Sequence, residues 1–164
     1  MKATQNSSLT ALVGKKVMVV DDETDTLKLM EIMLRQYGVE VITCDSAAVA
    51  MERLPVSRPD AIVIDIAMPE VDGYALIQQV RTLPAEQGGA IPAIALTAYT
   101  HARYRVKALN WGYQVYLAKP FEPSRLAAAL TLVTGRVLTS GHSFSICPHE
   151  RDNFIGPERP RGGT

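Results

Sequence analysis

The sequence has very few cysteines and no long apolar run. Its 164 residues include only two cysteines, Cys44 and Cys147, which stand far apart and in no metal-binding or redox spacing. Because such a chain carries no disulfide framework, a reducing, cytoplasmic location is the expected one. No apolar run approaches the ~18–20 residues that are needed to cross a bilayer. Residues 1–8 also lack the apolar core of a secretory signal, so we expect neither secretion nor membrane insertion.

The chain also lacks an excess of charge of either sign. Seventeen Lys and Arg residues stand against seventeen Asp and Glu residues, which gives a formal net charge of +0 at pH 7. This balance argues against a nucleic-acid surface held by excess positive charge, so we expect no direct DNA binding. With 47% hydrophobic residues, the chain can bury a core and cannot be wholly disordered.

Glycine and proline are concentrated near the C-terminus. Residues 135–164 hold five Gly and three Pro, a composition typical of low-complexity chains, and we expect this tail to be disordered. Residues 1–14 are polar without a sustained period, apart from a short apolar patch at 9–13, and are predicted to form a flexible leader. Dense apolar periodicity fills residues 15–134, which we interpret as one domain.

Short apolar runs alternate with helical patterns between residues 15 and 134. Most of the runs are nearly continuous, as in parallel strands that are covered on both faces, whereas the second run alternates, as in an edge strand. Pro55 is expected to stop the second helix. Five strands that alternate with five helices predict an α/β fold, with a parallel sheet and right-handed crossovers. The predicted strands span 16–20, 39–43, 61–64, 91–96 and 114–117, and the predicted helices span about 27–37, 46–54, 74–83, 100–111 and 123–134.

Polar residues that can bind ions stand at the carboxyl ends of four predicted strands. In an open parallel sheet, ligands bind at those ends, because parallel strands all finish at the same edge. We therefore expect these side chains to form one cluster at one edge of the sheet. They are Asp21 and Asp22 after the first strand, Asp65 after the third, Thr97 after the fourth and Lys119 after the fifth.

Three carboxylates in one cluster repel one another, and some would stay protonated without a compensating charge. A hard divalent cation such as Mg²⁺ removes this conflict, because it takes oxygen ligands. Lys119 adds a fixed positive charge, so the cluster could also receive a phosphoryl group, to which Thr97 could donate a hydrogen bond. Asp65 would then be the nucleophile that attacks phosphorus and forms an aspartyl phosphate.

Four stretches around these residues resemble the receiver domains of two-component response regulators, including the receivers attached to hybrid sensor kinases. The resemblance covers residues 15–134, and the four stretches together are highly specific. It implies a single-domain, flavodoxin-like (βα)5 sandwich, in which five parallel strands form a doubly wound sheet of order 2-1-3-4-5. The stretches are VMVVDDE at 17–23, VIDIAMPEVDG at 63–73, ALTA at 95–98 and YLAKPF at 116–121.

The resemblance assigns a role to each residue of the predicted site. It implies that Mg²⁺ is held by the acidic pair Asp21 and Asp22, by the backbone carbonyl of Ala67 and by Asp65, which is also the phosphoacceptor. It implies that Thr97 is the switch hydroxyl, Lys119 the phosphate-binding lysine and Tyr116 a switch aromatic that turns inward on phosphorylation. It also implies a cis peptide bond before Pro120.

The implied function is that of a stand-alone phosphorelay receiver rather than an enzyme. A sensor histidine kinase or a histidine phosphotransfer protein would donate the phosphoryl group. The change would reach an unknown downstream protein through the predicted helix 100–111, strand 114–117 and helix 123–134. The thirty residues after this helix are too few and too rich in Gly and Pro for an output domain. Ala67 and Tyr99 offer no carboxylate or amide to orient water, so we expect slow self-dephosphorylation.

Two other functions stay open on the sequence alone. One is a receiver-like scaffold that is never phosphorylated. The other is a phosphatase with an aspartyl nucleophile, although Ala67 stands where enzymes of the haloacid-dehalogenase type carry a second acid. Tyr116 also fits a half-buried strand aromatic without a switching role. The basic run at His101, Arg103, Arg105 and Lys107 fits a solvated helix face better than a partner-binding patch.

Overall fold

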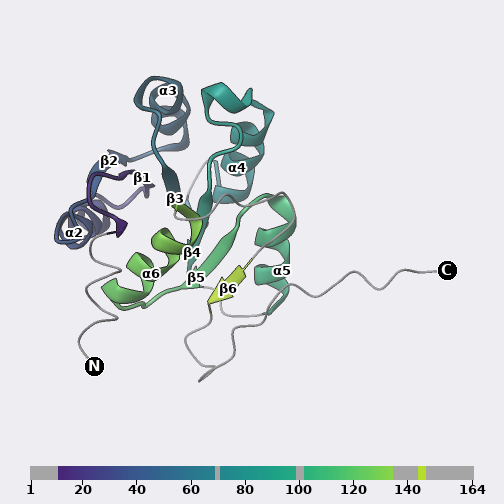
Figure 1. Ribbon diagram of the computed structural model, residues 1–164. Helices are drawn as coiled ribbons and strands as arrows, with labels where there is room; N and C mark the ends of the chain where they lie inside the picture. Colours follow the sequence, from purple (N-terminus) through teal and green to yellow (C-terminus); the bar gives the residue numbers. More distant parts are fainter. Residues whose placement is uncertain (1–10, 69–70, 99–101, 135–143, 147–164) are drawn as a thin grey trace.

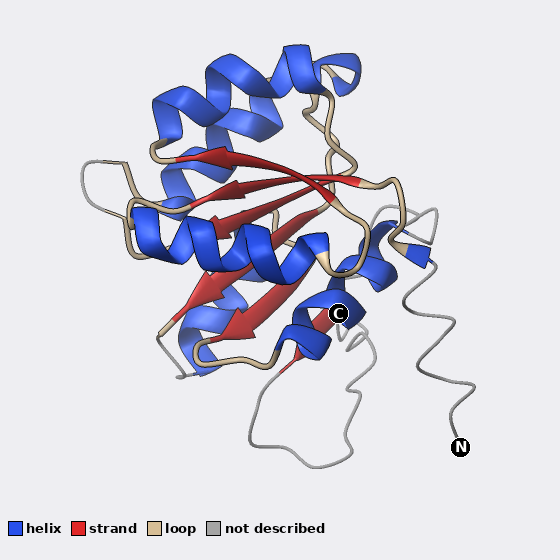
Figure 2. Cartoon of the chain, turned by 90° about the vertical axis from the view of Figure 1, so that its left-hand side faces the viewer, coloured by secondary structure: helices blue, strands red, loops and turns tan. Residues whose placement is uncertain are grey.

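A computed structural model describes residues 11–68, 71–98, 102–134 and 144–146 of the chain. This part is a parallel sheet that lies between two layers of helices (Figures 1 and 2). No helix in these ranges is long and apolar enough to cross a membrane. In chain order, the elements are β1 (Lys16–Val20), α2 (Thr24–Arg35), β2 (Glu40–Cys44), α3 (Ala47–Ser57), β3 (Ala61–Asp65), α4 (Gly73–Thr82), the short 3-10 helix η1 (Ala85–Gln87), β4 (Ala93–Thr97), α5 (Ala102–Trp111), β5 (Val115–Ala118), α6 (Pro123–Thr134) and β6 (Phe144–Ile146).

The strands lie in the order β2-β1-β3-β4-β5-β6, and every neighbouring pair is parallel. The predicted order 2-1-3-4-5 is confirmed, and β6 extends it beside β5. Every residue of β3 and β4 is buried, whereas only the last residue of β2 is buried. β2 is therefore the edge strand that its alternating sequence predicts.

The strands pack against two hydrophobic cores, one on each face of the sheet. Successive side chains of a strand point to opposite faces. Met18 and Val20 accordingly pack with α3, α4 and α5, while Val17 and Val19 pack with α2 and α6. Burial of apolar surface stabilises by about 25 cal/mol per Å². A shift of a strand by one residue would exchange the two faces, so this packing fixes the register of the strands and with it the alignment of their carboxyl ends.

Helix α3 runs past the proline that we expected to stop it. It begins at the predicted cap, Ser46, whose hydroxyl accepts a backbone hydrogen bond of 3.3 Å. The helix continues through Pro55 and closes at Arg58, whose left-handed backbone (φ 47°) brings its N–H to the Leu54 carbonyl at 3.2 Å. The missing N–H of Pro55 removes one hydrogen bond near the helix end, while beyond it the Ser57 carbonyl accepts a hydrogen bond from the Lys16 ammonium at 3.2 Å. The prediction that the helix ends before Pro55 is therefore wrong.

The folded domain begins earlier than we predicted. Leu12 has no exposed surface and packs in the core formed with α2 and α6. The Gly14 N–H donates a hydrogen bond to the Gly38 carbonyl at 2.9 Å, which ties this segment to the end of α2. The predicted leader, residues 1–14, therefore extends too far into the domain, and its residues 1–10 lie outside the described part.

Beside β5 the sheet has a strand that we did not predict. β6 pairs in parallel with β5, so that Val115, Tyr116 and Leu117 oppose Phe144–Ile146. It comes from the tail 135–164, which we expected to be disordered, and the other residues of that tail lie outside the described part. β6 therefore occupies the outer edge of β5 and is the last strand of the described sheet on this side.

One guanidinium ties the amino ends of β4 and β5 to α4. Arg81, in the last turn of α4, donates to the carbonyls of Gly89, Ile91 and Gly112 and to the amide oxygen of Gln114, at 2.6–3.3 Å. These contacts use all five N–H donors of a guanidinium. The edge of the sheet opposite the predicted site is thus cross-linked, which gives the site strands a rigid base.

Candidate functional site

The polar residues that follow four strands in the sequence lie at one edge of the sheet. Asp21 follows β1 directly, Asp65 ends β3, Thr97 ends β4 and Lys119 follows β5. Since these strands are parallel, their carboxyl ends lie side by side. The structure therefore places the predicted residues together at this edge, including Asp22, the neighbour of Asp21.

Three carboxylates form a compact cluster at this edge. Asp21, Asp22 and Asp65 each offer one oxygen atom, and these atoms lie within 4.8 Å of one another. Asp21 and Asp65 are 2% and 8% exposed, whereas Asp22 is exposed. Asp22 therefore marks the side from which solvent and ions reach the cluster.

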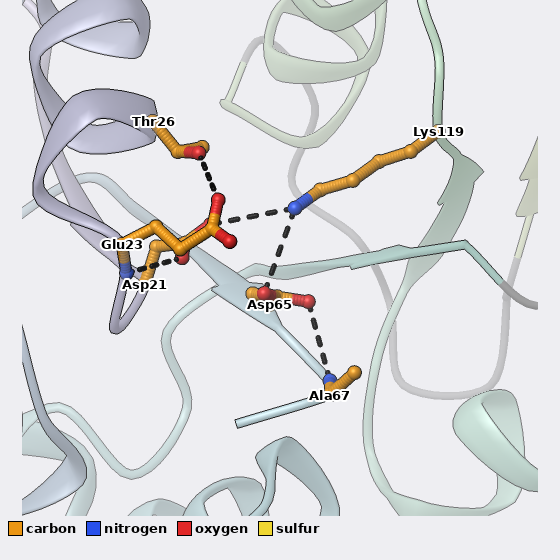
Figure 3. A network of polar contacts seen from close by, with 6 residues as sticks. All are labelled: Asp21, Glu23, Thr26, Asp65, Ala67 and Lys119. Atoms are coloured by element: carbon orange, nitrogen blue, oxygen red, sulfur yellow. Dashed lines mark hydrogen bonds and ion pairs between the residues drawn. The ribbon is translucent and has the colours of Figure 1, made fainter. Parts of the chain in front are cut away.

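Lys119 is the counter-ion of the two buried carboxylates. Its Nζ lies 3.4 Å from Asp21 Oδ2 and 3.5 Å from Asp65 Oδ2 (Figure 3). The other oxygen of each carboxylate accepts a hydrogen bond from the backbone two residues further on. The Glu23 N–H donates to Asp21 Oδ1 at 2.9 Å, and the Ala67 N–H donates to Asp65 Oδ1 at 3.2 Å. Each carboxylate is therefore held from two sides, by one backbone N–H and by the shared ammonium.

Burial makes the charged form of Asp21 unfavourable. Loss of hydration raises the pKa of Asp21 above its ordinary value, and the charge of Asp65 raises it further, while the Glu23 N–H and Lys119 act in the opposite direction. The balance leaves the pKa raised, so the single ammonium does not fully compensate this carboxylate. Additional positive charge among these oxygens would be stabilising.

Glycine at position 73 lets α4 begin against the backbone that carries Asp65. A Cβ atom on Gly73 would lie 2.7 Å from the Ile66 Cα and 3.0 Å from the Asp65 carbonyl oxygen, closer than such atoms approach. The Gly73 N–H donates to the Ile66 carbonyl at 3.0 Å, and Asp72 caps the helix by accepting from the Ala75 N–H at 2.8 Å. The sequence predicted only a turn and helix entry at Asp72 and Gly73. In the structure this entry also fixes the backbone behind the acidic cluster.

Thr97 and Tyr116 are both buried. Thr97 ends β4, and its carbonyl accepts a hydrogen bond from the Lys119 N–H at 2.7 Å. Tyr116 lies in the core formed with α3, α4 and α5, where its side chain is buried. The peptide bond between Lys119 and Pro120 is cis, as the resemblance implies.

Glu23 is an acidic residue of this edge to which we assigned no role from the sequence. Its carboxylate accepts a hydrogen bond from the Thr26 hydroxyl at 2.9 Å, in the first turn of α2 (Figure 3). Its backbone N–H orients Asp21. The sequence offered one indication of this role, the position of Glu23 directly after the acidic pair. A residue that acts through its backbone N–H cannot be recognised from its side-chain type.

The sequence profile of the response regulator receiver domain matches residues 17–131. An uncharacterized 14.6 kDa protein of Leptolyngbya boryana is 43% identical over 115 residues, which cover 70% of this chain and 86% of that protein. The transcriptional regulatory protein PrrA of Mycobacterium tuberculosis is 33% identical over 147 residues, which cover 87% of this chain and 61% of PrrA. The chain thus spans about half to three fifths of the length of the transcriptional regulators that it matches.

Solved structures share the fold. One is the receiver domain of a sensor histidine kinase from Pseudomonas aeruginosa PAO1, described with a magnesium ion coordinated in its active site cleft. It is 32% identical, has a TM-score of 0.68, and the match covers 76% of this chain and 100% of that chain. The chemotaxis protein CheY4 of Vibrio cholerae is 28% identical with a TM-score of 0.67, over 73% of this chain and 98% of that chain. With the profile matched over most of its length and this fold, the chain belongs to the response regulator receiver domain family.

Proposed function

We propose that this receiver domain accepts a phosphoryl group on Asp65 from a phosphohistidine of a donor protein and passes the change to another protein. The observation that carries the proposal is the Lys119 ammonium in contact with two buried carboxylates, Asp21 and Asp65, with Asp22 at the entrance. This network supplies a carboxylate nucleophile, a fixed cation and two further carboxylates. Phosphoryl transfer needs little more, because it depends on positioning and charge neutralisation.

The acidic cluster suits Mg²⁺, the ion that receiver domains bind in an acidic pocket. The proposed ligands are carboxylate oxygens of Asp21, Asp22 and Asp65 and the carbonyl oxygen of Ala67, an all-oxygen set of the kind that a hard cation takes. The pKa of Asp21 is raised chiefly by burial and further by the charge of Asp65, so a cation at these oxygens would favour the charged carboxylate. When bound, Mg²⁺ would neutralise charge on the phosphoryl oxygens.

Asp65 is the group placed to attack phosphorus. One of its carboxylate oxygens forms the new P–O bond while the P–N bond to the donor imidazole breaks, and the electron pair of that bond stays on the imidazole nitrogen. Lys119 already lies 3.5 Å from Asp65 Oδ2, so its ammonium is in position to pair with the transferred phosphoryl oxygens. The Ala67 N–H holds the other oxygen and keeps the carboxylate oriented.

Thr97 is the residue that would respond to the new charge. It ends β4 and follows Leu96, which lies opposite Asp65 of the neighbouring strand β3. Its hydroxyl can donate a hydrogen bond to a phosphoryl oxygen. A movement of Thr97 would pull on the segment that joins β4 to α5 and so bias the position of α5. Tyr116 is already buried in this structure, so its rotation is not a step of the proposal. The signal would leave through the face of α5, β5 and α6, where β6 lies along β5 (Figure 1).

Helix α2 offers a surface on which the donor protein can dock. The helix begins at the site, and Leu29 and Ile32 are 57% and 60% exposed about one helical turn apart. They lie roughly 8 and 12 Å along the helix from its first residue, at a rise of ~1.5 Å per residue. An exposed apolar pair so near the phosphoacceptor favours a helical protein partner. We therefore assign the contact with a histidine kinase or phosphotransfer protein to α2.

Ala67 is the reason to propose a phosphoacceptor rather than an enzyme that turns over. It is exposed two residues after Asp65 and carries a methyl group where a carboxylate or amide would orient an attacking water. Tyr99, the second position that we expect to govern the phosphoryl lifetime, lies outside the described residues. Hydrolysis of the aspartyl phosphate would then be slow, and the donor and target would set the duration of the signal.

Incubation with acetyl phosphate and Mg²⁺ should add one phosphoryl group to the protein, which intact mass spectrometry measures. Asp65→Asn should add none, because an amide is not a nucleophile at phosphorus. Asp45→Asn, at an exposed aspartate after β2, is the matched control and should behave like the wild type. A wild-type protein that stays unmodified would favour the scaffold, and turnover of a small phosphate ester that needs Asp65 would favour the phosphatase.

Asp21→Asn should raise the free energy of unfolding at neutral pH in EDTA. The amide keeps the acceptor for the Glu23 N–H but removes a buried charge whose ionisation folding makes unfavourable. The pKa of Asp21 is higher in the folded than in the unfolded protein. The ionisation of Asp21 therefore does not destabilise the fold at a pH below the pKa of the unfolded state, and it destabilises the fold fully at a pH above the pKa of the folded state. Wild-type stability should therefore decrease as the pH rises through the titration of Asp21, and Asp21→Asn should lack that component.

The same variant tests the metal site, with urea unfolding at fixed pH as the measurement. Mg²⁺ at about 100 times its dissociation constant should stabilise the wild type by about 2.7 kcal/mol. Asp21→Asn should gain far less at the same concentration, because it lacks one anionic ligand. Equal stabilisation of both proteins by Mg²⁺, or a less stable Asp21→Asn in EDTA, would contradict the proposed role of Asp21.

The phosphorylated protein, separated from acetyl phosphate, should keep its phosphoryl group for minutes or longer. Ala67→Asn should shorten the half-life by about tenfold or more, since its amide can orient water for attack on phosphorus. Ala48→Asn, at an exposed position on α3, is the control for a surface asparagine. A wild-type half-life of seconds would show that another group already activates the water.

Ile32→Glu should slow phosphoryl transfer from a phosphohistidine donor protein by about tenfold or more, since it places a charge in the apolar contact. Labelling by acetyl phosphate should not change, because this small donor does not touch α2. Val56→Glu introduces the same charge at an exposed valine on α3 and should leave both rates unchanged. If Ile32→Glu slows both reactions equally, the site itself is damaged and α2 is not the docking surface.

A further inference from the structure

We propose that Tyr113 is a positioning residue for the phosphoacceptor site. Its hydroxyl donates a hydrogen bond to the Gly73 carbonyl at 2.6 Å, although the two residues stand forty positions apart in the sequence. Tyr113 lies between α5 and β5 and is 1% exposed, whereas Gly73 begins α4 against the backbone of Asp65. Through Gly73, the hydroxyl holds the backbone from which Ala67 orients the Asp65 carboxylate. The inference rests on the proposed function for what the site does with that carboxylate.

Gly73 is the link between Tyr113 and the site. Its carbonyl accepts from Tyr113, and its N–H donates to the Ile66 carbonyl at 3.0 Å. It also packs directly on the backbone of the site, because a Cβ atom on Gly73 would lie 2.7 Å from the Ile66 Cα and 3.0 Å from the Asp65 carbonyl oxygen. A single residue therefore separates the Tyr113 hydroxyl from that backbone. In a close-packed interior, a displacement of Gly73 is transmitted to Asp65 and Ile66.

The segment that follows Asp65 is placed by the same core that contains Tyr113. Ile66 and Met68 are 4% and 7% exposed, and both pack in this core. Ala67 stands between them and is exposed, and its N–H donates to Asp65 Oδ1 at 3.2 Å. The carbonyl of Ala67 is a proposed ligand of Mg²⁺. The two groups of Ala67 that act on the site are therefore positioned by the packing of its buried neighbours.

Tyr113 is itself held in a turn that is anchored on both sides. Its N–H donates to the Ala108 carbonyl of α5 at 3.2 Å. The residue before it, Gly112, has a left-handed backbone (φ 114°), and its carbonyl accepts from Arg81 at 2.6 and 3.2 Å. Because the donor and the acceptor both belong to anchored segments, the bond from Tyr113 to Gly73 fixes the start of α4 relative to the turn between α5 and β5.

The Tyr113 hydroxyl remains a donor at neutral pH. Burial raises the pKa of Tyr113 well above its ordinary value, and nearby acidic groups, Asp65 among them, raise it further against the opposing charge of Arg81. The phenol thus lies close enough to the acidic cluster to be affected by its charge. Since it stays neutral there, Tyr113 contributes position and no charge to the site.

Tyr74 offers a matched comparison in the same core. Its hydroxyl also donates to a backbone carbonyl, that of Tyr104, at 3.3 Å, and its ring is buried. This bond joins α4 to α5, whereas the bond from Tyr113 ends on the residue that packs against the backbone of Asp65. Loss of either hydroxyl removes one hydrogen bond from the core. Only loss of the Tyr113 hydroxyl releases the backbone behind the site.

The test compares Tyr113→Phe with Tyr74→Phe in the full chain, since both variants keep the aromatic ring. Amide hydrogen exchange, followed by NMR, reports on the Ala67 and Gly73 N–H groups and needs neither a metal nor a phosphoryl donor. We expect these two groups to exchange about tenfold faster in Tyr113→Phe than in the wild type, because the segment opens more easily without the hydrogen bond. In Tyr74→Phe, their exchange should match that of the wild type.

Mg²⁺ and acetyl phosphate test the site itself. The dissociation constant of Mg²⁺, measured from the shift of the Ala67 amide resonance during titration, should rise by about tenfold in Tyr113→Phe. Labelling by acetyl phosphate at saturating Mg²⁺ should slow by about tenfold in the same variant, because the Asp65 carboxylate is less well oriented. Tyr74→Phe should keep both wild-type values, even if it loses as much thermal stability as Tyr113→Phe.

Two results would overturn the inference. The first is a Tyr113→Phe protein that loses thermal stability while exchange of the Ala67 N–H, Mg²⁺ affinity and labelling rate keep their wild-type values. Tyr113 would then support the core only. The second is an equal change of these quantities in Tyr113→Phe and Tyr74→Phe, which would show a general loosening of α4.

Labelling of the wild type separates this inference from the proposed function. If acetyl phosphate does not label the wild type, but the Ala67 N–H exchanges faster in Tyr113→Phe and not in Tyr74→Phe, only the proposed function fails. If the wild type is labelled on Asp65 and Tyr113→Phe matches it in exchange, Mg²⁺ affinity and labelling rate, only the role of Tyr113 fails.

Discussion

The ammonium of Lys119, shared between Asp21 and Asp65, is the interaction on which the site depends. It connects the end of β5 to the ends of β1 and β3, and it compensates part of the charge that burial makes unfavourable. One ammonium cannot balance three carboxylates within 4.8 Å, so the cluster keeps a negative charge that a divalent cation would offset. A phosphoryl group on Asp65 would compete with Asp21 for Lys119. The modification would therefore alter the contact that joins three strand ends, which is how a local change in charge can reach the segments beyond them.

The site was predictable because parallel strands all end at the same edge of a sheet, so the residues at their carboxyl ends lie together. Once the apolar runs are identified as parallel strands, Asp21, Asp65, Thr97 and Lys119 have to meet at one edge, and they do. The finer geometry was not predictable. The backbone N–H groups that orient Asp21 and Asp65, and the close approach of α4 that requires Gly73, depend on the path of the chain after each strand. Hydrophobic periodicity describes the strand and carries no information about that path.

The wrong predictions share one physical cause, because each concerned a segment whose structure depends on a distant contact. Leu12 stands in the segment that we interpreted as a leader but packs in the core formed with α2 and α6. Pro55 lacks an N–H, yet α3 continues past it to Ser57, whose carbonyl accepts a hydrogen bond from the Lys16 ammonium of β1. Phe144–Ile146 lies in a segment rich in Gly and Pro and pairs as a strand where β5 offers an unpaired edge. Local composition describes what a segment prefers alone, and tertiary contacts override that preference.

The proposed donor contact on α2 and helix α5 of the proposed output face lie on opposite sides of the sheet. α2 shares its core with α6, whereas α5 shares the other core with α3 and α4. A donor that sits on Leu29 and Ile32 would therefore leave the outer side of α5 uncovered, and a target that binds there would not have to wait for the donor to leave. Since β6 covers the edge of β5, a target that pairs as a strand would meet β6 and not β5, whereas on the helix surfaces charge would decide which protein binds.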